Sequence, residues 1–287
     1  MNQFSFNLSL ALTVPTLAVV AATASAAGSF KEPVGLQLYS LRAEFTRDVP
    51  STLEKVRGYG IKEVELAGTY NLTPARFREM LDANKLKAVS GHFPFERYRD
   101  DAEGIARDAK TLGIQYSGCA WIPHDGDFDE KECRTAMEVF NKAGEILARN
   151  GIKFFYHVHG FEFQPHGQGT LLDLLMAETK PKQVFYQMDV FWIHFPGQDP
   201  VKLLEKYRGR WVLMHLKDLK KGVATGSLSG HTDVVNDVVL GTGQLNFPAI
   251  LQAAKKAGIK HYFIEDESPT AAEQIPQSLS FLGTVKW

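Results

Sequence analysis

The sequence predicts an α/β fold, a single-domain (β/α)8 barrel that spans residues 27–287. Three observations support this prediction. Apolar, β-prone segments alternate with helix-like segments along this range, which favours a parallel sheet whose strands are connected by helices. A short glycine–isoleucine pattern recurs where helices would end. Eight alternating units in roughly 250 residues is also the size of a closed barrel.

Eight segments are expected to form strands because each is a short, apolar, β-prone run. In chain order they are Val34–Ser40, Glu63–Ala67, Ala88–His92, Tyr116–Trp121, Phe154–His159, Val184–Asp189, Val212–Lys217 and Tyr262–Glu265. The expected helices between them include Ser51–Tyr59, Thr73–Ala83, Ala102–Leu112, Glu130–Asn150 and Phe247–Ala257. An open doubly wound sheet is the alternative, but no glycine-rich phosphate loop follows the first strand.

The glycine–isoleucine pattern starts at Gly60, Gly113, Gly151 and Gly258. Glycine readily takes the left-handed conformation that ends a helix. Each pattern therefore predicts a helix C-terminus that leads directly into a strand. Asn84 is expected to cap another helix in the same way.

The first 26 residues are predicted to be an export signal. Residues 8–20 form an apolar stretch of signal-peptide length, and Ala24-Ser25-Ala26 provides a small-residue cleavage pattern before Ala27. The stretch before Leu8 lacks Lys and Arg, so an uncleaved anchor is the alternative. Cleavage would leave a periplasmic or secreted protein without a stable membrane span. Cys119 and Cys133 could then form a disulfide, or remain free buried thiols.

Composition narrows the class of partner. The chain is 44% hydrophobic and 23% charged, with a formal net charge of −1. Nucleic-acid-binding proteins usually carry a basic excess that neutralises phosphates, so this balance argues against a nucleic-acid partner. A small neutral or weakly charged ligand fits better, and the oligomeric state, including a homo-oligomer, stays open.

Four metal-ligating residue types lie at the ends of the later predicted strands. They are His157, Asp189, His215 and Glu265. In a barrel, the carboxyl ends of the strands surround one shared cavity. We therefore expect these side chains to bind a divalent metal ion there.

The fifth strand carries two further candidates, His159 and Glu162. A period of two places His159 on the same face as His157, so both are expected to point into the barrel. Glu162 could fold back over the site as a base or ligand, or be a solvated loop carboxylate. A single core histidine would be ordinary, but two on one face favour a functional role.

Other residues of the predicted site also have alternative roles. Asp189 could cap the next helix instead of binding metal. Lys217 shares a face with His215 and could hold a substrate oxygen, or form a surface pair with Asp218. Either Glu265 or Glu267 could be the last ligand, and Glu265 is preferred because it lies deeper.

The rest of the cavity is predicted to bind a sugar. Polar and aromatic side chains near other strand ends offer hydrogen bonds and ring faces. They are Gln37, Tyr39, Glu65, His92, Trp121 and Trp192. The two tryptophans could instead pack between helices and barrel. Residues 220–243 form a long loop that could cover the cavity and contain no basic cluster for a phosphate.

Taken together, these motifs resemble the xylose-isomerase-like sugar phosphate isomerase/epimerase family, a family of TIM barrels. The resemblance covers nearly all of residues 27–287. It rests on the residues 34–42, 64–68, 157–159 with Glu162-Phe163, 187–189 and 215–218.

The resemblance implies one catalytic divalent ion, often manganese, held by Glu, Asp, His and Glu; zinc, cobalt and magnesium remain open. Asp189, His215 and Glu265 match three of these positions. The first does not match, because His157 stands where many members have a glutamate that also transfers protons. This His-x-His version is similar to the branch with inosose dehydratases and with lyases or hydrolases of 3-keto-glycosides.

The expected chemistry is proton removal beside a carbonyl polarised by the metal. Return of the proton gives an isomer or epimer, whereas loss of a β-substituent gives elimination. In the second case His159 or His157 is the base, and Lys217 stabilises the oxyanion. A non-catalytic sugar-binding barrel is the alternative, and a metal-dependent abasic-site endonuclease of the same fold is disfavoured by the neutral charge.

Overall fold

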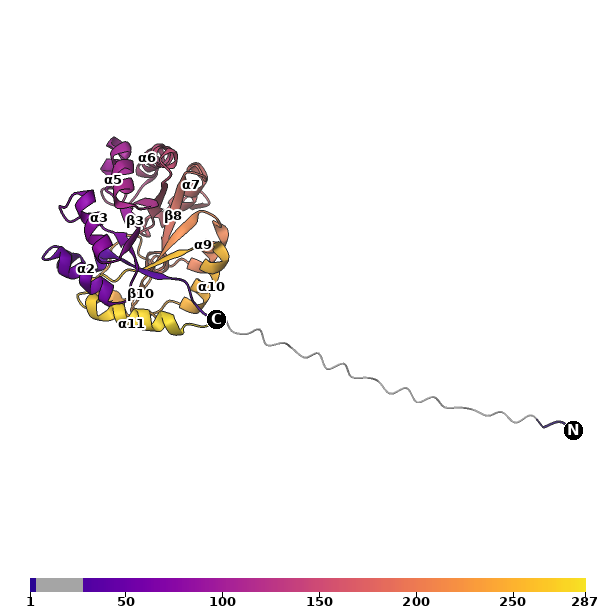
Figure 1. The fold of residues 1–287 in the computed structure, drawn as a ribbon. Helices are drawn as coiled ribbons and strands as arrows, with labels where there is room; N and C mark the ends of the chain where they lie inside the picture. The colour runs from indigo at the N-terminus through magenta and orange to yellow at the C-terminus, as the bar shows by residue number, and fades with distance from the viewer. Residues whose placement is uncertain (4–27) are drawn as a thin grey trace.

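The computed structural model describes residues 1–3 and 28–287 and confirms the closed (β/α)8 barrel (Figure 1). The predicted export signal lies almost entirely outside the described residues. Eight parallel strands close in the order β1-β12-β9-β8-β5-β4-β3-β2. They are β1 (Val34–Gln37), β2 (Glu63–Leu66), β3 (Lys87–His92), β4 (Tyr116–Cys119), β5 (Lys153–His157), β8 (Val184–Asp189), β9 (Trp211–Leu216) and β12 (His261–Ile264).

All eight predicted strands are present, but several end earlier than the sequence predicts. The β5 strand stops at His157, so His159 lies in the following loop. The β1 strand passes into the 3-10 helix η1 (Leu38–Leu41), because the side chain of Gln37 accepts a hydrogen bond from the backbone N–H of Tyr39. At these strand ends, backbone polar groups that form no hydrogen bond within the sheet bond instead to nearby groups.

Helices surround the barrel strands, as Figure 1 shows. The principal ones are α2 (Val49–Gly58), α3 (Pro74–Ala83), α5 (Ala102–Leu112), α6 (Glu130–Arg149), α7 (Leu171–Glu178), α9 (Pro200–Lys206), α10 (Phe247–Ala257) and α11 (Ala271–Thr284). Three shorter helices, α1 (Arg42–Phe45), α4 (Phe95–Asp100) and α8 (Val190–His194), lie in the connections after β1, β3 and β8. In the part of the chain that the structure describes, no helix is long and apolar enough to span a membrane.

The helix–strand junctions follow the glycine pattern. Gly60, Gly113, Gly151 and Gly258 all have positive φ angles, between +75° and +89°. This conformation is easily reached only without a Cβ atom, which explains the recurrence of glycine. Asn84 is the C-cap of α3, as predicted, but the left-handed conformation belongs to the next residue, Lys85, with φ of +56°.

The barrel interior is layered. Val89, Phe155, Leu213 and Phe263 form a buried apolar layer, and burial of each contributes about 1.5–3 kcal/mol. Because strand side chains alternate with a period of two, the next inward residue after each lies one layer nearer the carboxyl ends. The polar residues of the site therefore stand directly above an apolar floor.

The β9–α10 connection folds over the carboxyl ends of the strands. It forms a small hairpin from β10 (Asp218–Leu219) and β11 (Asp237–Val238). The carboxylate of Asp218 accepts hydrogen bonds from the backbone N–H groups of Gly241 and Gly243, both at 2.9 Å. Asp218 and Lys217 are buried, so they are not the surface pair considered above. Cys119 and Cys133 are buried free thiols.

Candidate active site

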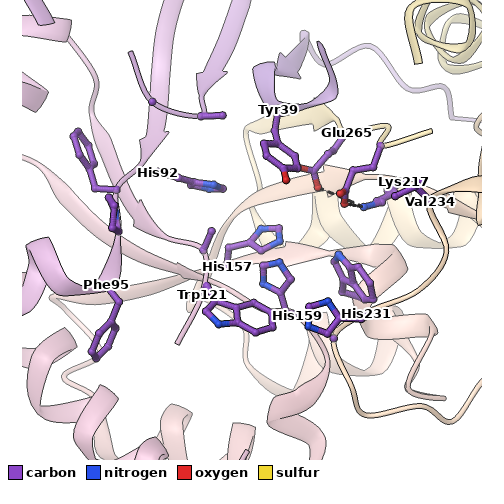
Figure 2. Close-up of a pocket in the computed structure, with 18 of the residues that line it drawn as sticks. Tyr39, His92, Phe95, Trp121, His157, His159, Lys217, His231, Val234 and Glu265 are labelled. Carbon is purple, nitrogen blue, oxygen red and sulfur yellow. Dashed lines mark hydrogen bonds and ion pairs between the residues drawn. The ribbon is translucent and has the colours of Figure 1, made fainter. Parts of the chain in front are cut away.

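A cavity of about 680 Å³ opens at the carboxyl ends of the strands, where the barrel architecture predicts it (Figure 2). Eight of the side chains predicted for the site line this cavity: Tyr39, His92, Trp121, His157, His159, Trp192, Lys217 and Glu265. Part of the β9–α10 loop, from Gly230 to Asp237, forms one wall of the cavity.

Four side chains at the base of the cavity form a compact set of potential ligands. They are His157, Asp189, His215 and Glu265, each offering one donor atom within 4.8 Å of all the others. Asp189 Oδ2 lies 3.9 Å from His157 Nε2 and 3.7 Å from His215 Nδ1. Glu265 Oε2 lies 3.2 Å from His215 Nδ1. Two imidazoles and two carboxylates suit a divalent transition-metal ion.

The two oxygens of Asp189 have different surroundings. Oδ1 accepts backbone N–H groups of Phe191 at 2.8 Å and Trp192 at 3.1 Å, and so caps helix α8. Oδ2 is buried and has no hydrogen-bond partner among the described residues. A buried carboxylate oxygen without a partner is unfavourable, and a cation between the four side chains would offset this cost. Capping and metal binding are therefore compatible at this residue.

A second layer of polar side chains orients the two histidines. Glu65 Oε1 lies 2.5 Å from Nε2 of His215, while Gln187 Oε1 lies 2.8 Å from Nδ1 of His157. The amide of Gln187 donates to Glu65 at 2.8 Å, which fixes the direction of its oxygen. A neutral imidazole at either position would donate to its second-layer oxygen and leave its other nitrogen facing Asp189.

Glu65 is held as an anion beneath the cavity. Burial alone would raise the pKa of Glu65, but the charges of His92 and His215 lower it to about 2, together with hydrogen bonds from His215 and Ser90. In the reverse direction, burial would lower the pKa of His215, but Glu265 and Glu65 raise it well above its usual value. The carboxylate of Glu65 therefore places a negative charge next to His215, one of the four candidate ligands.

His159 stands beside the cluster without belonging to it. Its ring centroid lies 4.5 Å from that of His157 and 5.9 Å from that of Trp192. Burial is the main reason that the pKa of His159 falls to about 3, and the charge of Lys217 contributes to the shift. The imidazole is therefore neutral at ordinary pH.

Lys217 supplies the positive charge of the cavity. It pairs with Glu267, and its Nζ lies 3.5 Å from Asp237 and 3.8 Å from Glu265. Burial would lower the pKa of Lys217, but these carboxylates raise it well above its usual value. The ammonium also lies 5.2 Å from the ring centroids of Phe191 and Trp192. Lys217 is therefore a permanent cation in a mostly buried position.

Comparison with known proteins agrees with this geometry. A model of the xylose isomerase-like TIM barrel family matches residues 53–285. The chain belongs to this family.

Several curated relatives are named as inosose dehydratases. That of Geobacillus thermodenitrificans (strain NG80-2) is 30% identical over 156 residues, which is 52% of this chain and only 50% of the relative. That of Lacticaseibacillus casei is 22% identical over 76% of this chain and 81% of its own length. The rhizopine catabolism protein MocC of Rhizobium meliloti is 24% identical, over 80% of this chain and 78% of its own length.

Solved structures show the same fold. A sugar phosphate isomerase/epimerase from Parabacteroides distasonis ATCC 8503 is 26% identical, with a TM-score of 0.73, and the match covers 89% of this chain and 99% of that one. The IolI protein, whose crystal structure holds a zinc atom, is 15% identical with a TM-score of 0.69, over 88% of this chain and 98% of that one. The IolI match shows likeness of fold alone.

Five predicted site residues of this xylose isomerase-like barrel do not line the cavity: Asp189 and His215 of the four-residue cluster, and Glu162, Gln37 and Glu65. Glu162 is fully buried in the loop after β5. Its carboxylate accepts hydrogen bonds from the hydroxyl of Tyr156 and from the backbone N–H groups of His159 and Gly160. Gln37 and Glu65 are also fully buried, and Gln37 donates to Glu65 at 2.7 Å. Their side chains contact other protein groups beneath the cavity, which supports a structural role in holding the site.

Other residues of the site were not predicted. His231 lines the cavity with its ring 5.2 Å from that of Trp121, yet its loop sequence carries no periodic signal. Asp237 reaches Lys217 from the same loop, and only the β10–β11 pairing brings it there. Of these residues, Gln187 could have been predicted from the sequence. It lies two residues before Asp189 on the same strand, so the two side chains share one face.

Proposed function

We propose that the protein is a metal-dependent enzyme that removes a proton beside the carbonyl of an unphosphorylated keto-sugar or keto-polyol. The observation that carries the proposal is the buried Oδ2 of Asp189, which has no hydrogen-bond partner among the described residues and lies among His157, His215 and Glu265. His159 and the cationic Lys217 line the same cavity. A ligand set next to a base and a cation provides the three functions that enolisation needs.

The ion would be held by His157, Asp189, His215 and Glu265. When bound, it would act as a Lewis acid towards the substrate carbonyl and make the adjacent C–H more acidic. Glu65 and Gln187 would keep the imidazoles in the required tautomers, as outer-layer partners of metal ligands commonly do.

His159 is the proposed base. It lines the cavity, its neutral form persists down to low pH, and its Nδ1 is buried without a hydrogen-bond partner among the described residues. Lys217 is proposed to donate a hydrogen bond to the oxygen on which negative charge develops. The ammonium is already oriented by Glu267 and Asp237, so little reorganisation is needed during the reaction.

The fate of the proton on His159 distinguishes two reactions. Return of the proton to carbon gives an isomer or epimer. Transfer to a departing hydroxyl at the β-carbon releases water and leaves an enol, which tautomerises to a 1,2-dicarbonyl compound because the α-carbon carries a hydroxyl. We favour this elimination, supported by the relatives named inosose dehydratases. Isomerisation is the second candidate, supported by the structural neighbour named sugar phosphate isomerase/epimerase.

The cavity argues against a phosphorylated substrate. Among the described residues, Lys217 is the only Lys or Arg that lines it, and three carboxylates surround that ammonium. A phosphate would meet these carboxylates without a free cation to bind it.

The reaction can be tested with unphosphorylated ketoses and keto-inositols in deuterated water, followed by NMR. Elimination predicts a product that has lost one water and gained a second carbonyl group or its enol, whereas isomerisation predicts a product with the composition of the substrate and deuterium at carbon. No deuterium uptake and no new product from any of these substrates would count against the proposed chemistry and favour a sugar-binding barrel.

Export to the periplasm or medium is a separate proposal, supported by the apolar stretch of residues 8–20 and by Ala24-Ser25-Ala26. N-terminal sequencing of the mature protein, expressed from its full-length gene, tests it. The proposal predicts a chain that begins at Ala27, and an intact Met1 on protein found in the cytoplasm would contradict it.

A further inference from the structure

The cavity has two chemically different ends. The reacting end contains His157, His159, Lys217 and Glu265. The other end, here called the apolar end, is formed by Phe93, Pro94, Phe95, Trp121 and Pro123, from the segments that follow β3 and β4. Figure 2 shows Phe95 and Trp121 on the side of the two histidines away from Lys217 and Glu265.

The cavity is larger than one sugar ring requires. Its volume of about 680 Å³ lies in the range of pockets that enclose drug-sized ligands. A ring whose carbonyl sits at the reacting end would leave the apolar end empty. The empty apolar end could bind a substituent of this ring.

The charges of the apolar end select the kind of substituent. Next to Phe95 the cavity lining contains an acidic side chain, Glu96. The guanidinium of Arg97 lies 5.6 Å from the ring centroid of Phe93, but it is already paired with Asp108 at 2.9 Å. An anionic group would therefore meet Glu96 without a free cation to bind it. An uncharged group with an apolar face is therefore favoured.

Trp121 is held rigidly in this end. Its ring stacks on His124 at 5.0 Å with an interplanar angle of 21°, and it meets Phe161 edge-on at 4.9 Å. The same indole lies 5.4 Å from the ring of His159 and 5.2 Å from that of His231. Trp121 therefore connects the reacting end with the covering loop, and a fixed aromatic side chain loses little entropy when it binds a ring.

We propose that the apolar end is a second subsite, which binds an uncharged ring attached to the reacting sugar. The ring is either an aryl group or a second sugar, since both present an apolar face to an indole. This inference rests on the proposed function, because it assumes that the reacting sugar occupies the ligand cluster.

Calorimetric binding of unreactive ligands tests the subsite without any turnover. Methyl β-D-glucopyranoside presents one ring, phenyl β-D-glucopyranoside adds an aryl group and cellobiose adds a second sugar. The proposal predicts that the phenyl glucoside, cellobiose or both bind at least about fivefold more tightly than the methyl glucoside, within the range expected for one aromatic contact. The comparison of the two larger ligands shows which ring is preferred.

Trp121→Ala should abolish this advantage, so that the phenyl glucoside, cellobiose and the methyl glucoside bind to the variant with affinities within about twofold of one another. Trp121→Phe should retain part of it, and Trp287→Ala, a matched substitution outside the cavity wall, should retain all of it. Thermal melting monitors whether each variant is folded.

Equal binding of all three ligands, no binding of any of them, or an advantage that survives Trp121→Ala would overturn the proposal. Aglycone-dependent binding without proton removal from any keto-sugar would leave the subsite intact and reject only the proposed reaction.

Discussion

Glu65 Oε1 lies 2.5 Å from Nε2 of His215, on the side of the imidazole opposite the other ligand side chains. The Nδ1 atom of the same ring faces Asp189 and Glu265. A carboxylate in this position fixes the tautomer and raises the basicity of a metal-ligating histidine. Because Glu65 also binds Ser90, Gln37 and Gln187, it connects four barrel strands beneath the site.

Replacing Glu65 should weaken metal binding. The change Glu65→Gln removes the negative charge but keeps the side-chain length, so we expect a loss of about 10–100-fold in metal affinity. Chelator competition measures this loss. Glu63→Gln is the matched control, because Glu63 lies on the same strand but pairs with His261 instead. Equal affinities for the Glu65 variant and the unsubstituted protein would remove Glu65 from the metal site.

Replacing His159 should separate catalysis from metal binding. His159 is near the ligands but outside the four-residue cluster, so His159→Asn should keep the metal content of the unsubstituted protein. Loss of a general base predicts a fall in kcat of about 10²–10⁴-fold. Metal analysis and initial rates on the same preparations give both values. Full activity in this variant would assign the base elsewhere.

Glu162 is expected to matter for stability and not for chemistry. Its buried carboxylate satisfies the Tyr156 hydroxyl and two backbone N–H groups of the loop that carries His159. Glu162→Gln should therefore lower the free energy of unfolding by about 1.5–3 kcal/mol, as for hydrogen bonds to a charged group. Urea unfolding measures this value. A loss of kcat as large as that of His159→Asn, in a variant of normal stability, would contradict this assignment.

Asp173 gives a prediction about acid stability. Burial alone would raise the pKa of Asp173, but hydrogen bonds from Lys206, Tyr207 and Thr170 lower it to about 2. A folded-state pKa below the unfolded value means that the carboxylate stabilises the protein above pH ~4, and that this contribution disappears as the pH falls towards 2. Asp173→Asn should be destabilising at pH 7, and the difference should shrink below pH 3.

Urea unfolding midpoints of Asp173→Asn and the unsubstituted protein, measured at pH 7 and pH 2.5, test whether the difference in stability shrinks at low pH. Asp82→Asn is a suitable control, since Asp82 is an exposed carboxylate that pairs with Arg78. A difference between Asp173→Asn and the unsubstituted protein that stayed constant across this range would show that the charge of Asp173 does not stabilise the fold.

The barrel and the convergence of the four candidate ligands could be predicted from the sequence because both follow from local rules. The period of strand side chains and the common orientation of parallel strands bring His157, Asp189, His215 and Glu265 to one place. The glycine junctions likewise depend only on backbone conformation, and all four have the predicted sign of φ.

The remaining features depend on contacts between distant segments. Glu65 and Gln37 have the same strand-end position as a substrate-binding residue, and only their burial against Gln187 and His215 shows otherwise. His231 reaches the cavity through an irregular loop, which no periodicity describes. Glu162 turns into the loop instead of the cavity because Gly160, with φ of +96°, reverses the chain before it.

Metal content of Asp189→Asn tests the central claim most directly. Asparagine keeps the oxygen that caps helix α8 but removes the charge of the buried Oδ2. Asp199→Asn is the matched control, because Asp199 caps helix α9 in the same way at an exposed position. Elemental analysis should find about one divalent ion per chain in the unsubstituted protein and in Asp199→Asn, and a large loss in Asp189→Asn. Equal metal content in all three, or none in the unsubstituted protein after incubation with manganese or zinc, would contradict the account.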